Sequence, residues 1–226
     1  KLSNKFLLIP IGPSTKAKVN HLKVVIDGKP VYQYELRVAP KTEDILWWSF
    51  FDVSRFAGKT ASITLTGGET AGIDLIKLGA KIPGKVPLYK EKLRPQFHFT
   101  TRRGWINDPN GLIYHKGLYH MYYQYNPVST RWGNMTWGHA VSKDLVHWKE
   151  QAAVLFPDSN GTCYSGAAFI DRNNLLGAKT GDEEVLTAFY LRTKIGLCMA
   201  TSNDAGMTFT DYKGNPVLPL KGARID

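Results

Sequence analysis

The chain has 226 residues, of which 43% are hydrophobic and 12% aromatic, and this is enough for one large or two ordinary domains with a packed core. A formal net charge of +10 can indicate a nucleic-acid partner. The basic residues are scattered as singles and pairs, however, so no nucleic-acid site is predicted. No run of eighteen apolar residues occurs, and the sequence therefore predicts no transmembrane helix.

Short apolar runs separated by turn residues fill the first part of the chain. Asp27-Gly28-Lys29-Pro30 is typical of a hairpin turn, and Gly67-Gly68 marks another turn. Several strands at this spacing favour a small β-sandwich. The expected strands cover residues 6–11, 21–26, 31–38, 45–51, 61–66 and 73–78.

Proline and glycine gather between residues 81 and 96. Because proline cannot donate to a central sheet, we expect an extended connector here. The chain is thus predicted to divide into an amino-terminal β-sandwich accessory domain at residues 1–86 and a second domain at residues 94–226.

The second region carries a faint internal repeat with an offset of about sixty residues. Ser142-Lys143-Asp144 followed by Trp148 matches Ser202-Asn203-Asp204 followed by Phe209. Strand-like residues precede each copy, so each unit is predicted to be one multi-stranded sheet, as in the blades of a β-propeller. Residues 97–226 supply about two blades, fewer than a propeller needs to close, and an all-β fold with a partial propeller is expected.

Three segments rich in tryptophan, asparagine and glutamine follow one another: residues 105–111 (WINDPNG), 123–127 (YQYNP) and 132–139 (WGNMTWGH). Taken alone, Asn-Asp-Pro-Asn-Gly is ordinary turn chemistry. Taken together, the segments offer flat aromatic faces for a sugar ring and amides for its hydroxyls. A carboxylate among them can stabilise the positive charge that develops when a glycosidic bond breaks, or can bond to the anomeric carbon.

These segments resemble glycoside hydrolase family 32, which contains invertases, inulinases, levanases and fructanases. The resemblance implies a five-bladed propeller and a retaining mechanism on β-linked fructofuranosides, with no cofactor. It makes Asp108 the nucleophile. Asn107 and Gln124 would hydrogen-bond the fructosyl hydroxyls, and Trp132 would form an apolar wall of the fructose subsite.

A later segment, residues 163–167 (CYSGA), is similar to the family's aromatic-Ser-Gly motif. The resemblance therefore adds Tyr164 and Ser165 to the same subsite, although tyrosine stands where the family usually has phenylalanine. The two cysteines, Cys163 and Cys198, have no metal-type spacing and are expected to be small buried hydrophobes.

The positions of the histidines along the chain indicate neither a metal site nor a nucleophile-base pair. They fall on separate expected strands or turns, without a close pair that has an acidic neighbour, and structural or surface roles are expected for them. The four in question are His115, His120, His139 and His147.

Two family motifs are absent from these 226 residues. The last three residues, Arg224-Ile225-Asp226, do not form Arg-Asp-Pro, and no glutamate fits the Glu-Cys motif that supplies the acid/base. Glu183 and Glu184 are expected in a solvated turn. Because retaining hydrolysis needs two carboxylates, we expect a truncated chain with little or no hydrolysis of its own.

Three functional hypotheses follow. The first is a β-fructofuranosidase of exo type acting on levan, inulin or sucrose. The second is a catalytically inactive fructan-binding module, and the third is a β-rich structural piece with no working site. Because polymer substrates are met outside the cytoplasm, a secreted, periplasmic or cell-surface protein is expected.

Overall fold

A computed structural model describes residues 1–13 and 19–220. The described chain is nearly all β, with short 3₁₀ turns as its helical content, so the predicted all-β class is confirmed. No helix in these residues is long and apolar enough to cross a membrane. The chain divides into two compact units: Lys1–Trp105 with Asn126–Asn134, and Ile106–Tyr125 with Met135–Asp226. The predicted domain limits at residues 86 and 94 stay a prediction.

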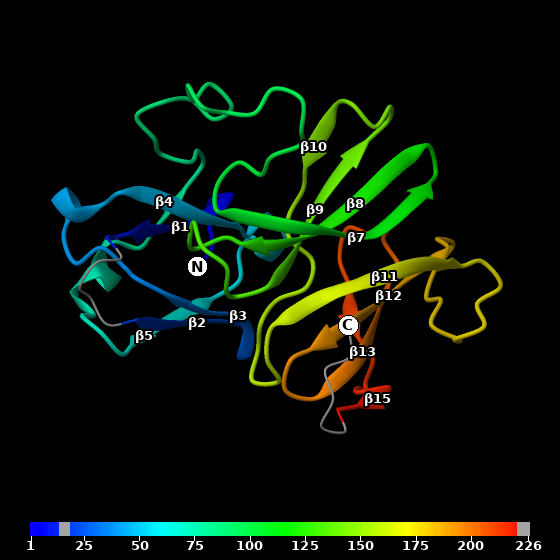
Figure 1. The fold of residues 1–226 in the computed structure, drawn as a ribbon. Helices are drawn as coiled ribbons and strands as arrows, with labels where there is room; N and C mark the ends of the chain where they lie inside the picture. Colours follow the sequence, from blue (N-terminus) through cyan, green and yellow to red (C-terminus); the bar gives the residue numbers. More distant parts are fainter. Residues whose placement is uncertain (14–18, 221–226) are drawn as a thin grey trace. The chain divides into compact units, whose positions relative to one another are not determined.

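The first unit contains two three-stranded antiparallel sheets (Figure 1). One has the order β4-β1-β6, with β1 at Phe6–Ile11, β4 at Trp47–Asp52 and β6 at Lys77–Gly79. The other has the order β3-β2-β5, with β2 at Asn20–Ile26, β3 at Lys29–Leu36 and β5 at Ala61–Thr66. Leu22, Val24 and Ile26 alternate with solvent-facing or partly covered residues along β2, as expected for a strand with one buried face.

Aromatic rings fill much of the interior of this unit. Tyr32 and Tyr34 stack on Phe51 with ring centroids 4.5 and 5.2 Å apart, and Phe6 meets Phe50 edge to face at 5.4 Å. Such pairs add to the burial free energy of the rings. The strands predicted in this region therefore meet through a shared apolar interior, as a sandwich requires.

The hairpin turn between β2 and β3 forms where it was predicted. Asp27 and Gly28 both have positive φ, 47° and 79°, which matches the backbone twist of a two-residue hairpin. The strand expected at residues 73–78 is wrong in its first part, because Ala71–Leu75 forms a 3₁₀ turn and only Lys77–Gly79 pairs with β1.

The proline-rich segment is more folded than the extended connector that was expected. Turns close between Pro87 and Lys90 and between Glu91 and Arg94. Arg94 binds the Glu91 carboxylate at 2.9 and 3.0 Å and donates to the Thr101 carbonyl at 2.8 Å. An arginine with several fixed acceptors thus holds this segment in place.

The second unit contains two larger antiparallel sheets. The first has the order β10-β9-β8-β7, with β7 at Trp105–His115, β8 at Leu118–Asn126, β9 at Thr136–Ser142 and β10 at Trp148–Glu150. The second has the order β11-β12-β13-β14, with β15 also paired to β13. Its strands are β11 at Cys163–Asp171, β12 at Val185–Arg192, β13 at Gly196–Ser202, β14 at Thr210–Asp211 and β15 at Leu218–Pro219.

The internal repeat is confirmed in atomic detail. Ser142 ends β9 and donates to Asp144 Oδ1 at 3.0 Å, while Ser202 ends β13 and donates to Asp204 Oδ1 at 2.7 Å. Each serine thus closes the third strand of its own sheet with the same Ser-x-Asp turn. Two sheets that repeat the same arrangement of strands and turn are what consecutive propeller blades require.

Trp137 lies at the centre of the apolar core that the two sheets share. It is fully buried on β9, and its ring meets that of Tyr190 on β12 edge to face at 6.1 Å. The core also contains Tyr122, Val154, Leu155, Cys163, Ala188, Cys198 and Ala200.

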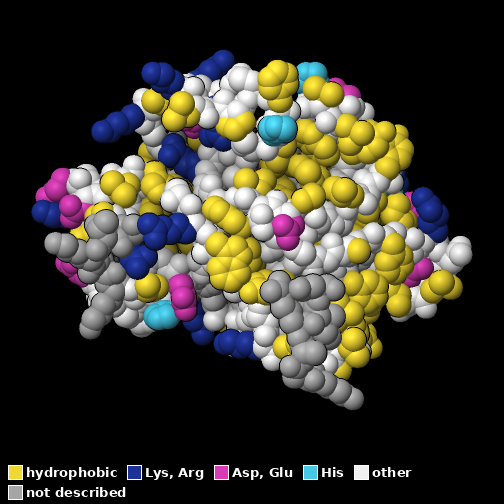
Figure 2. All heavy atoms as spheres, viewed as in Figure 1, with side chains coloured by type: hydrophobic (Ala, Val, Ile, Leu, Met, Phe, Trp, Pro, Cys, Tyr) yellow, Lys and Arg dark blue, Asp and Glu magenta, His cyan; other side chains and the backbone are white. Residues whose placement is uncertain are grey.

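Other apolar side chains of this unit face solvent. Leu112 and Tyr114 on β7 are 64% and 58% exposed, and Phe169 on β11 is 42% exposed. In Figure 2 hydrophobic side chains gather over the part of the view where Figure 1 places β7 and β8. Exposed apolar patches of this kind are typical of surfaces that contact other protein.

Candidate functional site

Asp108 lies on β7, which is an edge strand of its sheet. Its side chain is exposed, as are those of Asn107 and Pro109 on either side. The turn expected from Asn-Asp-Pro-Asn-Gly is therefore wrong, because the segment is part of an eleven-residue strand. Proline is tolerated there because an edge strand leaves some N–H groups outside the ladder.

Ser165 on β11 holds the Asp108 carboxylate. Its hydroxyl donates to Asp108 Oδ2 at 2.7 Å. The pairing of β11 with β12 shifts register between Cys163 and Gly166, and such a bulge re-aims the side chains within it. Figure 1 shows β7 and β11 running alongside each other, each at the edge of its own sheet.

Gln124 lies on β8 and is only 2% exposed. Its Nε2 donates to the Cys163 carbonyl at 3.1 Å, whereas its buried Oε1 has no hydrogen-bond partner among the described residues. An unsatisfied buried acceptor costs about 1–3 kcal/mol. The amide thus ties β8 to the start of β11 and leaves one acceptor for a donor from elsewhere.

Tyr164 is partly buried next to Ser165. Its backbone carbonyl accepts the indole N–H of Trp137 at 2.9 Å, so the start of β11 rests on the central tryptophan of the core. The structure thus brings together Asp108, Ser165, Tyr164 and Gln124. Trp132 is 62% exposed and belongs to the first unit, in the segment Asn126–Asn134.

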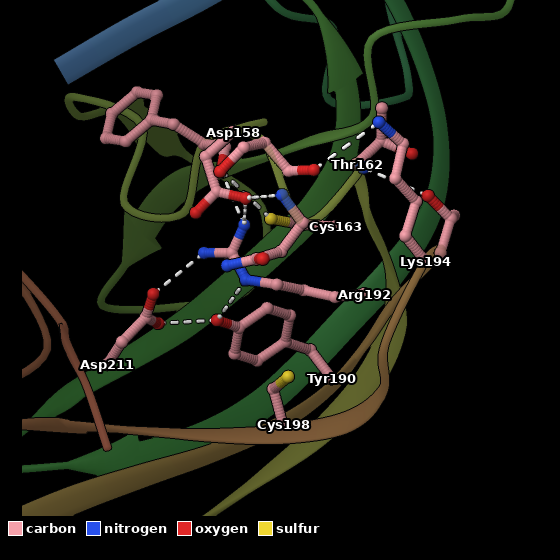
Figure 3. Close-up of polar contacts among 12 residues, drawn as sticks. Asp158, Thr162, Cys163, Tyr190, Arg192, Lys194, Cys198 and Asp211 are labelled. Atoms are coloured by element: carbon pink, nitrogen blue, oxygen red, sulfur yellow. Dashed lines mark hydrogen bonds and ion pairs between the residues drawn. The ribbon is translucent and has the colours of Figure 1, made fainter. Parts of the chain in front are cut away.

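A buried arginine lies opposite Cys163 in the ladder of β11 and β12 (Figure 3). Arg192 binds Asp158 and Asp211, each at 2.8 Å, and its Nε donates to the hydroxyl of Tyr190 at 3.1 Å. The guanidinium is 5% exposed, so its charge is compensated by fixed partners rather than by water. This network holds the strand start that carries Tyr164 and Ser165, and sequence reasoning did not find it.

Cys163 and Cys198 are free and buried, as predicted. β12 separates their strands, which places the two backbones about 9.5 Å apart and beyond the ~7 Å limit for a disulfide. Burial raises the pKa of the Cys163 thiol to about 12. Both residues therefore act as small core side chains rather than as nucleophiles.

His120 and His139 lie on separate strands, as expected, and form a close buried pair that the sequence did not predict. His120 Nδ1 lies 3.1 Å from His139 Nε2, and the His139 ring stacks on Tyr122 at 4.5 Å. Burial, with a smaller contribution from His120, lowers the pKa of His139 to about 3. The two residues are diagonal neighbours on adjacent strands, with His120 opposite Val141 and His139 opposite Tyr122, and only the sheet register could reveal their contact.

The other two histidines have acidic neighbours. His115 Nδ1 lies 3.4 Å from Glu184, and His147 Nδ1 lies 2.7 Å from Asp144. In the described residues no group of three or more His, Cys, Asp or Glu side chains is placed to hold a metal ion.

Glu183 and Glu184 lie at the far end of β7 from Asp108. Glu183 binds Lys116 at 2.6 Å, and Glu184 lies against His115, the last residue of β7. Seven residues of strand separate His115 from Asp108, which corresponds to roughly 23 Å. Neither glutamate is therefore placed to act with Asp108. Residues 224–226, which do not form Arg-Asp-Pro, lie outside the described residues.

The model of the "Glycosyl hydrolases family 32 N-terminal domain" matches residues 98–224, a region that holds Asp108, Gln124 and Ser165. The chain belongs to glycosyl hydrolase family 32. A levanase of Bacillus subtilis is 50% identical over 139 residues, which cover 60% of this chain and 20% of the levanase. An extracellular exo-inulinase of Aspergillus niger is 38% identical over 58% of this chain and 28% of its own length.

Solved structures of this family share the fold. The exo-inulinase of Aspergillus awamori gives a TM-score of 0.54 at 37% identity, covering 58% of this chain and 30% of the inulinase. A fructofuranosidase of Schwanniomyces occidentalis complexed with fructose gives 0.52 at 41% identity, covering 56% and 27%. The chain therefore spans less than a third of each of these relatives.

Proposed function

We propose that this chain provides the nucleophile and part of the fructose subsite of a retaining β-fructofuranosidase, with Asp108 as the nucleophile. The observation that carries this is the exposed Asp108 carboxylate, held by the Ser165 hydroxyl at 2.7 Å. One carboxylate oxygen is fixed by this bond. The other is left to face an anomeric carbon, where it can stabilise developing positive charge and form the glycosyl ester.

The remaining subsite residues are proposed to bind the fructosyl group. Asn107 lies next to the nucleophile and is exposed, and Gln124 has a buried Oε1 that a sugar hydroxyl would satisfy. Tyr164 and Ser165 present the bulged start of β11. Trp132 is proposed as the apolar wall, because an exposed indole suits the apolar face of a sugar ring.

A second candidate function is a fructan-binding module without hydrolysis. Its support is the carboxylate count: no Glu-Cys pair occurs in the 226 residues, and Glu183 and Glu184 lie roughly 23 Å from Asp108 along the strand. Protonation of the leaving oxygen requires a second carboxyl group about 5 to 5.5 Å from the nucleophile. We therefore expect the 226-residue chain to bind fructose and to hydrolyse fructosides slowly or not at all.

The proposed substrate class is β-fructofuranosides, namely levan, inulin or sucrose. The similar proteins are named levanase, exo-inulinase and invertase, and all of these names refer to substrates with a terminal fructosyl group. Because such polymers are met outside the cytoplasm, we propose a secreted, periplasmic or cell-surface location.

The test uses protein-observed NMR of the whole chain titrated with fructose. The Trp137 indole N–H reports on the site because it donates to the Tyr164 carbonyl beside Ser165. We expect Asp108→Asn and Ser165→Ala each to weaken fructose binding about tenfold, since a hydrogen bond to a charged group is worth about 1.5–3 kcal/mol. Asp182→Asn, at an exposed carboxylate of the β11–β12 connection, is the matched control.

Two results would contradict the proposal. Unchanged fructose affinity in Asp108→Asn would remove Asp108 from the site. Turnover of sucrose, inulin or levan by the unmodified chain, abolished by Asp108→Asn, would keep the nucleophile and overturn the expected need for a further carboxylate.

A further inference from the structure

The first unit contains a pocket of about 270 Å³. Its floor is apolar and buried, with Ile11, Leu36 and Val128. Two indoles, those of Trp47 and Trp132, line it, and the charged side chains of Glu35, Arg37 and Arg131 stand around it. Strands of the sandwich thus provide one side of the pocket, and the segment Asn126–Asn134 provides the other.

That segment is fixed on the sandwich at two points. The Ser49 hydroxyl, fully buried on β4, donates to the Pro127 carbonyl at 2.6 Å. Asn134 binds the backbone of Glu35 on β3 through both amide atoms, at 2.9 and 2.7 Å.

The segment is also braced internally. The Asn126 Nδ2 donates to the Arg131 carbonyl at 2.9 Å, and its Oδ1 accepts from Val128 N at 3.3 Å. The wall that carries Arg131 and Trp132 is therefore preformed, which lowers the cost of ordering it around a ligand.

The chemistry of the lining matches a neutral polyhydroxyl ligand. Indole faces pack on the apolar face of a sugar ring, and guanidinium and carboxylate groups donate to and accept from its hydroxyls. Glu35 offsets part of the charge of Arg37 and Arg131, so the pocket is less suited to a phosphate. Small-molecule pockets hold about 300–1,000 Å³, so a space slightly smaller than this fits one or two sugar rings.

We propose that this pocket binds a fructosyl residue of a fructan, so that the amino-terminal sandwich is itself part of the sugar-binding surface. The inference rests on the proposed function for the class of sugar. It goes beyond that function because Leu46, Trp47 and Arg37 belong to the sandwich and not to the region that matches the family. Trp132, assigned to sugar by resemblance, is the one residue common to both sets.

The whole chain is titrated with inulotriose and with levantriose while the six indole N–H signals are followed by NMR. Trp47→Phe and Trp132→Phe identify the two pocket signals, and Trp137 reports on the Asp108 site. We expect the Trp47 signal to shift with saturation. Arg131→Ala should raise the dissociation constant read at Trp47 at least fivefold, and Leu46→Asn should raise it severalfold.

Both altered side chains face solvent, Leu46 at 65% exposure, so these variants should fold. Arg172→Ala, which removes an arginine 68% exposed in the second unit, is the matched control and should leave the Trp47 response unchanged. Asp108→Asn should also leave it unchanged.

The responses of the Trp47 and Trp137 signals distinguish failure of this inference from failure of the proposed function. If Trp137 responds and Trp47 stays still at saturation, the pocket inference is overturned and the proposed function stands. If Trp47 responds and Trp137 does not, the pocket is supported and the Asp108 site loses its support. If neither signal moves, or if Arg131→Ala binds as the unmodified chain does, the pocket is not a fructosyl site.

Discussion

Asn134 pairs with Glu35 as a neighbouring strand would: its Oδ1 accepts from Glu35 N at 2.9 Å, and its Nδ2 donates to Glu35 O at 2.7 Å. β3 is an edge strand, and an edge presents unpaired backbone groups. One side-chain amide, 99 residues away in sequence, therefore satisfies two of these groups. The same contact fixes the position of the segment that carries Trp132.

Substitution of Asn134 should separate two contributions to this contact. Its φ of +50° suits Asn or Gly, so Asn134→Gly removes the side-chain hydrogen bonds, including a longer one to Asn126 Oδ1 at 3.4 Å, at a compatible φ. Asn134→Ala removes the same bonds and also places alanine in a left-handed conformation that it tolerates less well than asparagine. We expect losses of about 1–2 kcal/mol for the glycine variant and about 1 kcal/mol more for the alanine variant. Urea denaturation measures both. Equal stability of the two variants would contradict the strain argument.

Gly111 lies where β7 meets the shared core of the second unit. It has φ of +47°, and a Cβ there would come within 2.9 Å of Tyr122 Cδ2, 3.1 Å of Ala168 and 3.2 Å of Trp137. Because buried rings have little room to shift, we expect Gly111→Ala to cost about 2–4 kcal/mol, combining overpacking with backbone strain. The displaced β7 should also weaken fructose binding at Asp108.

Gly117 is the matched control for this prediction. It also has positive φ, +80°, but a Cβ there would meet nothing within 4 Å. Gly117→Ala should therefore show only the backbone cost of about 1 kcal/mol, with unchanged fructose affinity. If thermal unfolding shows the two variants to be equally destabilised, packing around Gly111 is not the cause.

Local sequence signals predicted much of this fold. The alternation of apolar residues along β2 and the Asp27-Gly28 turn depend on neighbours in the chain. The Ser-x-Asp repeat depends on the same short-range chemistry, and the two turns at Ser142 and Ser202 have matching hydrogen bonds. Such features are visible without knowing which strands pair.

Long-range partners could not be read from the sequence. Asp108 stands in a segment with strong turn propensity, yet the sheet keeps it extended, because pairing outweighs local preference. The sequence assigned Ser165 and Asp108 to the same subsite but did not predict the hydrogen bond between them. The pairing of His120 with His139 depends on strand register, and the partners of Arg192 come from three separate segments.

Arg192 should be the most sensitive charged residue of the second unit. Removal of its guanidinium in Arg192→Met leaves Asp158 and Asp211 without their shared cation. Breaking a buried ion pair costs about 3–5 kcal/mol. These carboxylates are 31% and 44% exposed, so we expect the lower part of that range. Arg192→Lys should recover only part of the loss, because an ammonium cannot reach both carboxylates in the geometry of the fork.

Thiol labelling measures the effect of the same substitution on the start of β11. In the unmodified chain both cysteines are buried and should react with iodoacetamide only after unfolding. Arg192→Met should expose Cys163 before Cys198, because the start of β11 loses the guanidinium that lies opposite it on β12. Arg172→Met, at a surface pair 3.6 Å from Glu184, should cost less than about 1 kcal/mol. Equal labelling rates for Arg192→Met and the unmodified chain would show that Arg192 does not hold this strand.

The buried pair of His120 and His139 should make the second unit sensitive to mild acid. His139 has a pKa of about 3 in the folded chain because burial disfavours its charged form, against about 6.5 when unfolded. A depressed histidine pKa means that the unfolded state binds the proton first, so stability is full above pH 6.5 and is lost as the pH falls towards 3. Between pH 7 and pH 5 this amounts to a loss of about 2 kcal/mol.

His139→Gln, which cannot titrate, should show a flatter dependence of unfolding free energy on pH over that interval. If His139→Gln retains the full slope, the acid sensitivity arises from another group, and the neutral His120–His139 pair is not what limits stability in this range.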